Sequence, residues 1–459
     1  MTPVACGQNF GYLIFIQMRN SLRLLKKYRL LIMLSLAFIA GGAQAATNFL
    51  VGADMSLLAY FQTNGITYRS NGVPQDALQL LKNRGFNCIR LRLFTSNPAQ
   101  AQADPYNYVN NTNYSIPLAM RVKNAGLKLL LDFHYSDTWA DPSHQATPAA
   151  WANFNFPQLA AQLRNYSSNT IAAFRNAGAL PDYVQTGNEI TGGLLWTNGQ
   201  LYGTANPSAQ WSNVGLLLKA AVQGVNDAAP VNSPQIIIHI DRGGDWPGTQ
   251  YFFDNLIHTQ NVPFDIIGES YYPFYHGPLT NLFLCLSNAA LAYAKPVMVM
   301  ETAFPWTNSY WTTNLYGFAP TTNGQAQYAI AVAQIIKQIP NGLGSGIFWW
   351  GAEYQKLNGV NEAGYDTTSF FNAQGNLLPA AGALGQLSAP LKLSINLVTN
   401  HLQIQWPLSG AGLQLTTTTS TTTTAWITVT NAVQSTGGTF YLSLPISNHG
   451  SRFYRLQGN

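Results

Sequence analysis

Charge is scarce in this chain of 459 residues, of which only 9% are Asp, Glu, Lys or Arg. With so few charges, the chain lacks the clustered Lys and Arg that a nucleic-acid-binding surface needs. A hydrophobic content of 47%, including 12% aromatic residues, excludes a disordered protein. Glutamate is rarer than aspartate, and its five positions are Glu189, Glu269, Glu301, Glu353 and Glu362. A mechanism that uses glutamates therefore has few candidates.

Several catalytic and metal-binding motifs are also missing. There is no HExxH and no paired CxxC, and the seven histidines are scattered, so a transition-metal site is poorly supported. The absence of a GxSxG elbow argues against a serine hydrolase of that class. No glycine-rich turn of dinucleotide-binding spacing follows the first predicted strand.

The basic residues are concentrated near the N-terminus, ahead of the apolar run Leu30–Ala40 and the small-residue segment Ala43–Ala45. This order predicts a signal peptide, residues 1–45, that is cleaved after Ala45. The run is shorter than the about 20 residues of a spanning helix, so no stable membrane span is expected in the mature chain. Export implies a secreted, periplasmic or cell-surface protein. Cleavage removes five basic and no acidic residues, which changes the net charge from +5 to zero.

Three cysteines are present, and Cys6 lies in the predicted signal peptide. Cys88 lies in a segment with a strand-like pattern, and Cys285 lies in a segment with a helix-like pattern. We expect two buried thiols, with a single disulfide as the alternative.

From Phe49 onward, eight short apolar runs alternate with longer amphipathic segments. The predicted strands are Phe49–Asp54, Phe86–Phe94, Leu127–His134, Asp182–Glu189, Gln235–Asp241, Phe264–Tyr272, Pro296–Glu301 and Gly344–Trp350. The predicted helices include Pro74–Arg84, Ile116–Asn124, Phe156–Asn176, Ser208–Asp227, Leu279–Ala294, Gly324–Ile339 and a last one after Leu377. Strands that are covered on both faces form continuous Val/Ile/Leu-rich runs. The pattern predicts an α/β fold, a (β/α)8 TIM barrel over residues 46–387, in preference to a doubly wound open sheet.

The composition changes near Pro390, beyond which there are no acidic residues. Apolar and polar residues then alternate, which predicts a small all-β module over residues 388–459. The run Thr416–Thr424 fits either a flexible loop or part of an edge strand. A sandwich core and a sugar-binding surface both remain open for three aromatic residues: Trp406, Trp426 and Tyr441.

Polar side chains close nearly every predicted strand of the barrel. They are Asp54, Arg90, Arg92, Asp132, His134, Asn188, Glu189, His239, Asp241, Glu269, Tyr272, Glu301, Trp349 and Trp350. Chemistry in a TIM barrel lies at the carboxyl ends of the strands, so this set is the candidate site. Carboxylates and aromatic rings are the equipment of glycoside hydrolysis, in which one carboxyl group protonates the leaving oxygen and another attacks the sugar or activates water.

Glu189 and Glu301 close the fourth and seventh strands, so they can face each other across the mouth of the barrel. This pairing predicts a retaining mechanism, in which the two carboxyl groups lie about 5–5.5 Å apart.

Eight motifs resemble, in order, those of the endo-β-1,4-galactanases of glycoside hydrolase family 53 in clan A. They are GADMS, IRLRLFTSNP, LLLDFHYSDTWADP, TGNEITGGLLWTNG, IIHIDRGGDW, GESYYPFYHG, VMVMETAFPW and GIFWW, and they cover residues 49 to about 387. The resemblance implies a TIM barrel, a retaining double displacement, and β-1,4-galactan of type I arabinogalactan, a pectin side chain, as the polysaccharide substrate.

The same resemblance implies that Glu189 is the general acid/base and Glu301 the nucleophile. Glu189 then needs a raised pKa, whereas Glu301 is expected to stay ionised beside Arg90. Asn188 would hydrogen-bond the sugar 2-hydroxyl, Tyr272 the nucleophile, and Trp350 would stack under the reacting sugar. Further substrate-binding candidates are Asp54, Arg92, His134, Asp137, Trp139 and Asp241. For Asp137 and Asp141, bracing of the loop is an equal alternative.

The chain departs from the family pattern after the eighth strand, where Trp-Glu-Pro-Ala-Trp is replaced by Trp350-Gly351-Ala352-Glu353-Tyr354. Glu269 matches no catalytic position of the family and is expected to be a salt-bridge or hydrogen-bond partner. The mechanism requires no cofactor. Calcium stays open, because some bacterial members bind it in this loop, and here the oxygen ligands on offer are Asn358, Asn361, Glu362 and Asp366.

Two alternatives to a monomeric galactanase remain. One is a clan relative that cleaves another β-1,4-glycan, such as mannan. The other is a glycan-binding protein that has lost its activity, although both carboxylates, the Asn, the Arg and the stacking Trp are all present.

Overall fold

The computed structural model describes residues 49–203, 206–309, 315–390, 392–407, 410, 413–420, 425–436, 439–445 and 452–457. The predicted signal peptide and its cleavage position lie outside these residues. The chain divides into two compact units, and the larger one is Phe49–Ser388. Within the described ranges, no helix has both the length and the apolarity to cross a membrane.

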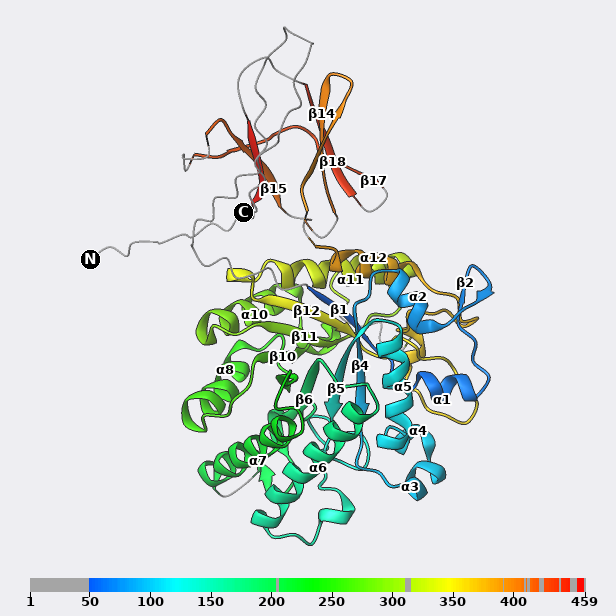
Figure 1. The fold of residues 1–459 in the computed structure, drawn as a ribbon, viewed down its shortest axis with the longest axis vertical. Coiled ribbons are helices and arrows are strands. Elements are labelled where there is room, and N and C mark those ends of the chain that lie inside the picture. Colours follow the sequence, from blue (N-terminus) through cyan, green and yellow to red (C-terminus); the bar gives the residue numbers. More distant parts are fainter. Residues whose placement is uncertain are drawn as a thin grey trace, which may run out of the picture. The chain divides into compact units, whose positions relative to one another are not determined.

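Eight parallel strands close into a barrel, which confirms the predicted fold class (Figure 1). They are β1 (Leu50–Asp54), β4 (Cys88–Leu93), β5 (Lys128–Phe133), β6 (Tyr183–Thr186), β9 (Gln235–Ile240), β10 (Ile266–Ser270), β11 (Val297–Thr302) and β12 (Gly344–Trp349). Seven of the strands lie within the predicted apolar runs, and β11 extends one residue beyond its run, to Thr302. Two small hairpins interrupt the loops, and they are β2 (Arg69–Ser70) with β3 (Val73–Pro74), and β7 (Gly193–Leu194) with β8 (Gly199–Gln200).

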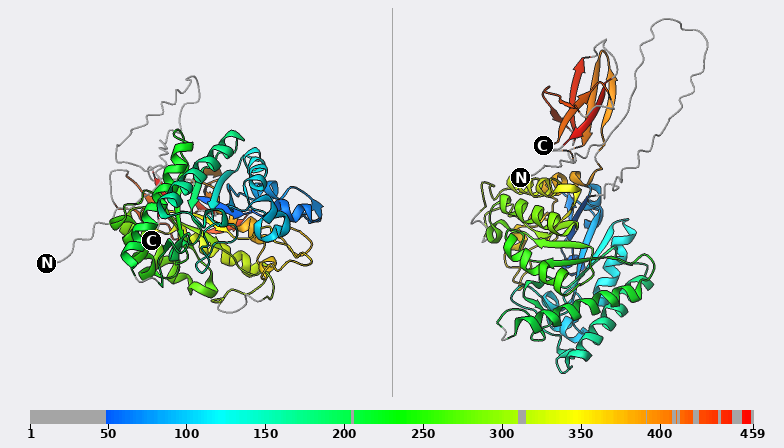
Figure 2. Two further views of the ribbon diagram at one scale, coloured as in Figure 1. Left: turned by 90° about the horizontal axis from the view of Figure 1, so that it is seen from below. Right: turned by 90° about the vertical axis from the view of Figure 1, so that its left-hand side faces the viewer.

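Helices lie outside the ring of strands (Figure 2). The helices that connect or follow strands are α2 (Ala77–Asn83), α5 (Thr112–Asn124), α6 (Phe156–Asn176), α7 (Pro207–Ala228), α8 (Trp246–Asp254), α10 (Leu279–Tyr293), α11 (Thr322–Lys337) and α12 (Pro379–Gly385). Shorter loop helices are α1 (Leu58–Thr63), α3 (Pro98–Ala103), α4 (Pro105–Tyr108) and α9 (Pro273–His276).

Uncharged side chains begin several of these helices. Asn155 accepts a hydrogen bond from the backbone N–H of Gln158, whose own side chain accepts from the backbone N–H of Asn155, so the two form a capping box at the start of α6. Asn111 and Thr321 cap α5 and α11 in the same way, through a side-chain oxygen. The chain therefore starts long helices without acidic residues, which fits its low charge.

The barrel interior contains an apolar layer to which every strand contributes. Its members are Leu50, Cys88, Leu130, Tyr183, Ile237, Ile266, Met298, Met300 and Phe348. Since side chains alternate along a strand, the residues two positions further on also face inward. On β4, β5, β6 and β9 these next residues are the polar ones Arg90, Asp132, Gln185 and His239. The apolar layer therefore forms the floor on which a polar layer lies.

Both described cysteines are buried and unpaired, as expected from the sequence. Cys88 lies in the apolar layer and Cys285 lies on α10.

The residues from Ala389 onward form a second unit of antiparallel strands. One sheet has the order β13 (Ser394–Val398), β14 (His401–Pro407), β18 (Thr439–Pro445), β17 (Gln434–Thr436), and the other has the order β16 (Ile427–Thr428), β15 (Gln414–Thr418), β19 (Phe453–Gln457). Thr416–Thr418 thus belong to a middle strand, not to an edge, while residues 421–424 lie outside the described ranges. Trp406 is part of the core of this unit, whereas the Arg455 guanidinium lies 4.2 Å from the ring centre of Trp426.

Gly52 leaves room in the barrel for the ring of its cross-strand neighbour Phe348. A Cβ atom at Gly52 would lie 2.2 Å from that ring, so we expect Gly52→Ala to lower the free energy of unfolding by about 1–3 kcal/mol. Gly382→Ala in α12 is the matched control, because its nearest neighbouring atom would be 3.8 Å away, and it should be neutral or stabilising by up to about 1 kcal/mol. Urea unfolding measures both changes, and equal stability of the two variants would contradict the close approach.

Candidate active site

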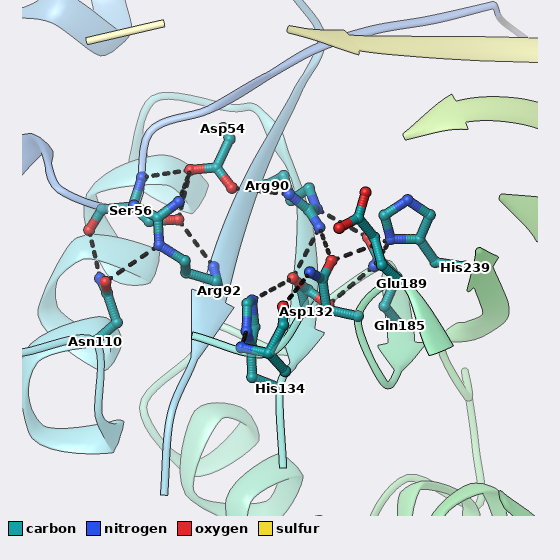
Figure 3. A network of polar contacts seen from close by, with 12 residues as sticks. Asp54, Ser56, Arg90, Arg92, Asn110, Asp132, His134, Gln185, Glu189 and His239 are labelled. Atoms are coloured by element: carbon teal, nitrogen blue, oxygen red, sulfur yellow. Dashed lines mark hydrogen bonds and ion pairs between the residues drawn. The ribbon is translucent and has the colours of Figure 1, made fainter. Parts of the chain in front are cut away.

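The polar side chains predicted at the strand ends converge on one network at the carboxyl ends of β1, β4, β5, β6 and β9 (Figure 3). Its centre is Arg90 on β4, whose side chain is 1% exposed. The guanidinium lies within hydrogen-bond distance of five acceptors, which are Gln185 Oε1 at 2.8 Å, Asp54 Oδ2 at 3.1 Å, Asp132 Oδ2 at 2.8 Å, Asn188 Oδ1 at 2.8 Å and Glu301 Oε1 at 2.9 Å. One cation thus balances three buried carboxylates.

Arg92 lies two residues further along β4 and faces the same side. Its Nη1 atom pairs with Asp54 Oδ1 at 3.2 Å, and its guanidinium carbon lies 4.3 Å from the ring centre of Trp139 and 5.8 Å from that of Trp350. The arginine therefore holds two aromatic rings at the mouth of the barrel through cation–π contacts. The Nη2 atom of the same guanidinium donates a hydrogen bond of 3.3 Å to the Tyr354 hydroxyl oxygen.

Three of the predicted substrate-binding residues are almost fully buried. The side chains of Asp54, Arg90 and Arg92 are 0%, 1% and 1% exposed. Because their polar atoms are engaged with one another and with neighbouring side chains, these residues position the site. Their direct contact with a substrate stays a prediction.

A bulge in β11 turns Glu301 toward the barrel axis. In the pairing with β10, Glu269 lies opposite Val299 and Ser270 lies opposite Glu301, so Met300 is an extra residue on β11. Since Met300 already belongs to the inner apolar layer, the bulge lets two consecutive side chains face inward. The Glu301 carboxylate then accepts from Arg90 through Oε1 and from the Tyr272 hydroxyl through Oε2, at 3.0 Å.

Burial raises the pKa of Glu301 to about 7, although Arg90 and the Tyr272 hydroxyl lower it. Asp132 and Asp54, which share Arg90 with Glu301, raise the pKa further. Arg90 thus favours the ionised form of Glu301, as the sequence led us to expect, but the same cation also serves two other acids.

Glu189 follows β6 in a left-handed backbone conformation, with φ of 48°. Its Oε1 atom accepts a hydrogen bond of 2.6 Å from the Ser270 hydroxyl. Burial, then the neighbouring charges of Glu301 and Asp241, raise the pKa of Glu189 well above its usual value, as the sequence led us to expect. Since Glu301 has a cationic partner and Glu189 is hydrogen-bonded to a neutral hydroxyl, a proton shared by this pair resides on Glu189.

The other residues of the third-strand motif hold the loop that follows β5. His134 Nδ1 accepts from the backbone N–H of Ala140 at 2.8 Å, so its Nε2 carries the hydrogen that reaches Asp132 at 3.1 Å. Burial is also the main reason that the pKa of His134 is lowered. Asp137 accepts from the Thr95 hydroxyl and from the backbone N–H of Ala149, which agrees with the loop-bracing alternative.

Asp241 and the remaining candidates occupy the rim of the site. The Thr191 hydroxyl donates to Asp241, whose pKa is raised mainly by burial. Trp139 and Trp350 are both partly exposed, so their rings are accessible from the mouth of the barrel. Asn188 donates from Nδ2 to the Ala140 carbonyl at 2.8 Å, which fixes the orientation of its amide.

The remaining glutamates lie away from this pair. Glu269 points outward from the barrel and accepts from the Thr249 hydroxyl and the Arg242 backbone N–H, both at 2.9 Å, so it is a hydrogen-bond partner. Glu353 is fully buried, and it accepts from the backbone N–H of Leu57 at 2.7 Å. The replaced motif after β12 thus supplies a structural carboxyl group.

The calcium alternative has limited support from the loop after β12. Glu362, its buried carboxylate, already pairs with Lys356 at 2.7 Å and accepts from the backbone N–H of Leu357 at 2.7 Å. Over the described ranges, no group of three or more His, Cys, Asp and Glu residues is arranged to hold a metal ion. A calcium ion at these residues would have to displace Lys356.

Sequence reasoning missed several residues of the network, which are Gln185, Ser270, Ser56 and Asn110. Gln185 bonds Arg90 and Asp132, and Ser270 bonds Glu189. The alternation of side chains along a strand could have found Gln185 and Ser270. Gln185 lies two residues after Tyr183, and Ser270 lies four residues after Ile266. Since Tyr183 and Ile266 face the barrel interior, Gln185 and Ser270 face it too.

Known proteins resemble this chain over its barrel. The model of glycosyl hydrolase family 53 matches residues 50–384. An arabinogalactan endo-β-1,4-galactanase of Humicola insolens is 32% identical over 347 residues, which are 73% of this chain and 97% of that protein. A probable arabinogalactan endo-β-1,4-galactanase A of Aspergillus terreus is 35% identical over 326 residues, which are 69% of this chain and 88% of that protein.

Two solved structures support the same relationship. The GH53 catalytic domain of Ignisphaera aggregans superposes with a TM-score of 0.66 at 32% identity, covering 73% of this chain and 95% of that one. A structure from a study of two fungal β-1,4-galactanases superposes with a TM-score of 0.65 at 30% identity, covering 73% of this chain and 98% of that one.

Removal of Arg90 should leave Asp132 and Glu301 buried without their cation, while Asp54 keeps its contact with Arg92. We expect Arg90→Met to lower the free energy of unfolding at neutral pH by about 3–5 kcal/mol. The surface pair of Arg121 with Asp76, at 2.9 Å and with side chains 37% and 47% exposed, offers the matched control. Arg121→Met should cost at most about 1 kcal/mol in the same urea titration. A loss no larger than that in the Arg90 variant would show that the network does not depend on this cation.

Proposed function

The chain belongs to glycosyl hydrolase family 53, and from this membership we propose that it is a retaining endo-hydrolase of β-1,4-galactan, including the side chains of type I arabinogalactan. The observation that carries the proposal is the contrast between Glu189 and Glu301. Both lie at the mouth of one barrel, but only Glu301 has a cationic partner, so the pair can hold one proton and one negative charge.

In the first step, the ionised Glu301 attacks the anomeric carbon of the sugar. The bond from that carbon to the glycosidic oxygen breaks as Glu189 gives its proton to the oxygen, and a glycosyl ester of Glu301 remains. In the second step, Glu189 removes a proton from water, which attacks the same carbon and releases Glu301. The configuration of the anomeric carbon is thereby retained.

The neighbours of the two carboxylates suit these roles. Arg90 and Tyr272 stabilise the charge of Glu301 before attack and receive it again when the ester is hydrolysed. The amide of Asn188 carries a second N–H besides the one bonded to Ala140, and we assign this second N–H to the 2-hydroxyl of the reacting sugar. Trp350, held near Arg92, offers an apolar ring on which a sugar face can stack.

We further propose that the enzyme is exported and acts as a monomer. The basic segment before Leu30–Ala40 and the small residues at Ala43–Ala45 support export with cleavage after Ala45. A near-neutral mature chain suits a neutral polysaccharide, because stacking and hydroxyl hydrogen bonds then provide the binding. N-terminal sequencing of the protein from the culture medium and its size in solution test these two points.

Loss of either catalytic carboxylate should abolish release of reducing ends from linear galactan. We expect a fall of roughly 10⁴-fold or more for Glu301→Gln and about 10²–10⁴-fold for Glu189→Gln. Glu269→Gln is the matched control, because burial raises the pKa of this outward-facing glutamate well above its usual value, and a neutral amide closely replaces a neutral acid.

The substrate and the stereochemistry are tested on the wild-type enzyme. Galactan, mannan and other β-1,4-glycans are compared, and NMR follows the anomeric configuration of the first products. Cleavage of another glycan but not of galactan would reject the substrate assignment, and initial formation of the opposite anomer would reject the double displacement.

The Tyr272 hydroxyl should set the acid limb of the pH profile. This hydroxyl stabilises the ionised form of Glu301, so its removal raises the pKa of Glu301, and activity is then lost at a higher pH as the solution is acidified. We expect the acid limb of kcat/KM to move up by about one to two pH units in Tyr272→Phe, since a hydrogen bond to a charged group contributes about 1.5–3 kcal/mol.

Tyr271→Phe is the control for this shift. The Tyr271 hydroxyl donates to the Gly277 carbonyl at 2.6 Å and contacts neither catalytic carboxylate. A similar shift in both variants would mean that the effect comes from the fold of the loop and not from the contact with Glu301.

A further inference from the structure

A chain of buried hydrogen bonds leads from the interior of the barrel to Glu189. The Ser270 hydroxyl lies 2.6 Å from Glu189 Oε1, His239 Nε2 lies 2.9 Å from Ser270 Oγ, and Gln185 Nε2 lies 2.9 Å from His239 Nδ1. Ser270, His239 and Gln185 are fully buried. His239 and Gln185 lie beside Glu189 in Figure 3. The reaction steps above assign none of these three residues a role.

The direction of each hydrogen bond in this chain is fixed at its far end. Gln185 Oε1 accepts from Arg90 Nε at 2.8 Å, and Gln185 Nε2 donates to Asp132 Oδ1 at 2.9 Å, so the orientation of the amide is determined. Gln185 Nε2 is therefore the donor to His239 Nδ1, and this shorter contact of 2.9 Å prevails over the one of 3.1 Å between the same nitrogen and Asn188 Oδ1. The hydrogen of a neutral His239 then lies on Nε2 and points to Ser270 Oγ.

Ser270 has a single hydroxyl hydrogen. Because Oγ receives a hydrogen bond from His239, this hydrogen is directed at Glu189 Oε1. A protonated Glu189 then carries its acidic hydrogen on the other oxygen, Oε2. This series of hydrogen bonds thus determines which carboxyl oxygen of Glu189 donates the proton.

His239 performs this task without adding charge. Burial, then the charge of Arg90, lower the pKa of His239 well below its usual value, so the ring stays neutral. A charged imidazolium so near the acid would favour ionisation of Glu189 and remove the proton that the first step requires.

We propose that His239 and Ser270 are positioning residues for Glu189: the Nε2–H group of His239 orients the Ser270 hydroxyl, which binds Oε1 and leaves Oε2 to transfer the proton. This proposal rests on the acid/base role given to Glu189 above. It concerns how the acid is held, whereas the family resemblance concerns only which residue is the acid.

Several other groups act on Glu189 from the surrounding elements. They are Glu301 on β11, Asp241 after β9, Asp141 in the loop after β5, and the neutral tyrosines Tyr272 and Tyr365. The three carboxylates oppose ionisation of Glu189, and the Ser270 hydroxyl favours it. Loss of the Ser270 hydroxyl should therefore raise the pKa of Glu189 further.

The first test measures the titration of the Glu189 carboxyl group directly, without a substrate. Only five glutamates occur in the sequence, so ¹³C-labelled glutamate gives few side-chain carboxyl signals, and Glu189→Gln identifies that of Glu189. In Ser270→Ala the titration of Glu189 should move up by about one pH unit or more, whereas Ser270→Thr, which keeps a hydroxyl, should stay close to the wild type. An unchanged titration in Ser270→Ala, or an equal shift in both variants, would overturn the proposal.

The second test needs no substitution of Gln185, His239 or Ser270, whose series of hydrogen bonds to Glu189 is called the relay below. Nitrogen-15 NMR of labelled histidine distinguishes the two neutral tautomers and the imidazolium, and His239 is assigned by through-bond correlation. We expect the Nε2–H tautomer across the pH range in which the protein is folded. A hydrogen on Nδ1, or a charged ring at neutral pH, would refute the relay even if the Ser270 variants failed to fold.

Kinetics separates this proposal from the proposed function. With galactan, the basic limb of kcat/KM should move to higher pH in Ser270→Ala, and kcat should fall where hydrolysis of the ester limits turnover, because Glu189 must then be ionised. Ser270→Thr should restore both. If the wild type does not cleave galactan, the proposed function fails, while the two NMR experiments still decide how Glu189 is held.

Discussion

The structure depends on the contact of one buried guanidinium with three carboxylates. Without Arg90, the negative charges of Asp54, Asp132 and Glu301 would lie together in a desolvated barrel, which is far too costly for a folded chain. With Arg90 in place, the strands β1, β4, β5 and β11 are joined at their carboxyl ends. The same guanidinium therefore connects four strands of the barrel and stabilises the negative charge of Glu301, the proposed nucleophile. Fold and proposed function thus depend on one interaction.

The two glutamates proposed to be catalytic, Glu189 and Glu301, differ through their neighbours, not through their depth. Both are nearly buried, and burial raises the pKa of each. Glu301 is connected to a cation and a phenol, whereas Glu189 is connected to a serine and, behind it, to a histidine that stays neutral. The barrel thus directs its positive charge to one carboxylate and a neutral donor to the other. An acid and a nucleophile arise from the same residue type in this way.

The fold could be predicted because each strand is covered on both faces and so forms an unbroken apolar run, such as the one before Glu301. The Trp246–Asp254 helix was missed, since it has only nine residues and contains Pro247 and Gly248 in its first turn. Most of the site followed from polar residues at strand ends. Ser270 and Gln185 did not, because a small polar residue within a strand has the sequence pattern of an ordinary buried residue. The raised pKa of Glu301 could not be predicted either, since it depends first on burial and then on the other acids that share Arg90.

The bulge that adds Met300 to β11 places a core side chain and the nucleophile next to each other in the sequence. The charged groups of the site consequently lie directly above an apolar floor, and the rings of Trp139 and Trp350 lie beside Arg92. Salt screens exposed charges within about 10 Å at 0.1 M, but it reaches desolvated pairs much less. The electrostatic arrangement of the site is therefore less sensitive to ionic strength than pairs on the surface.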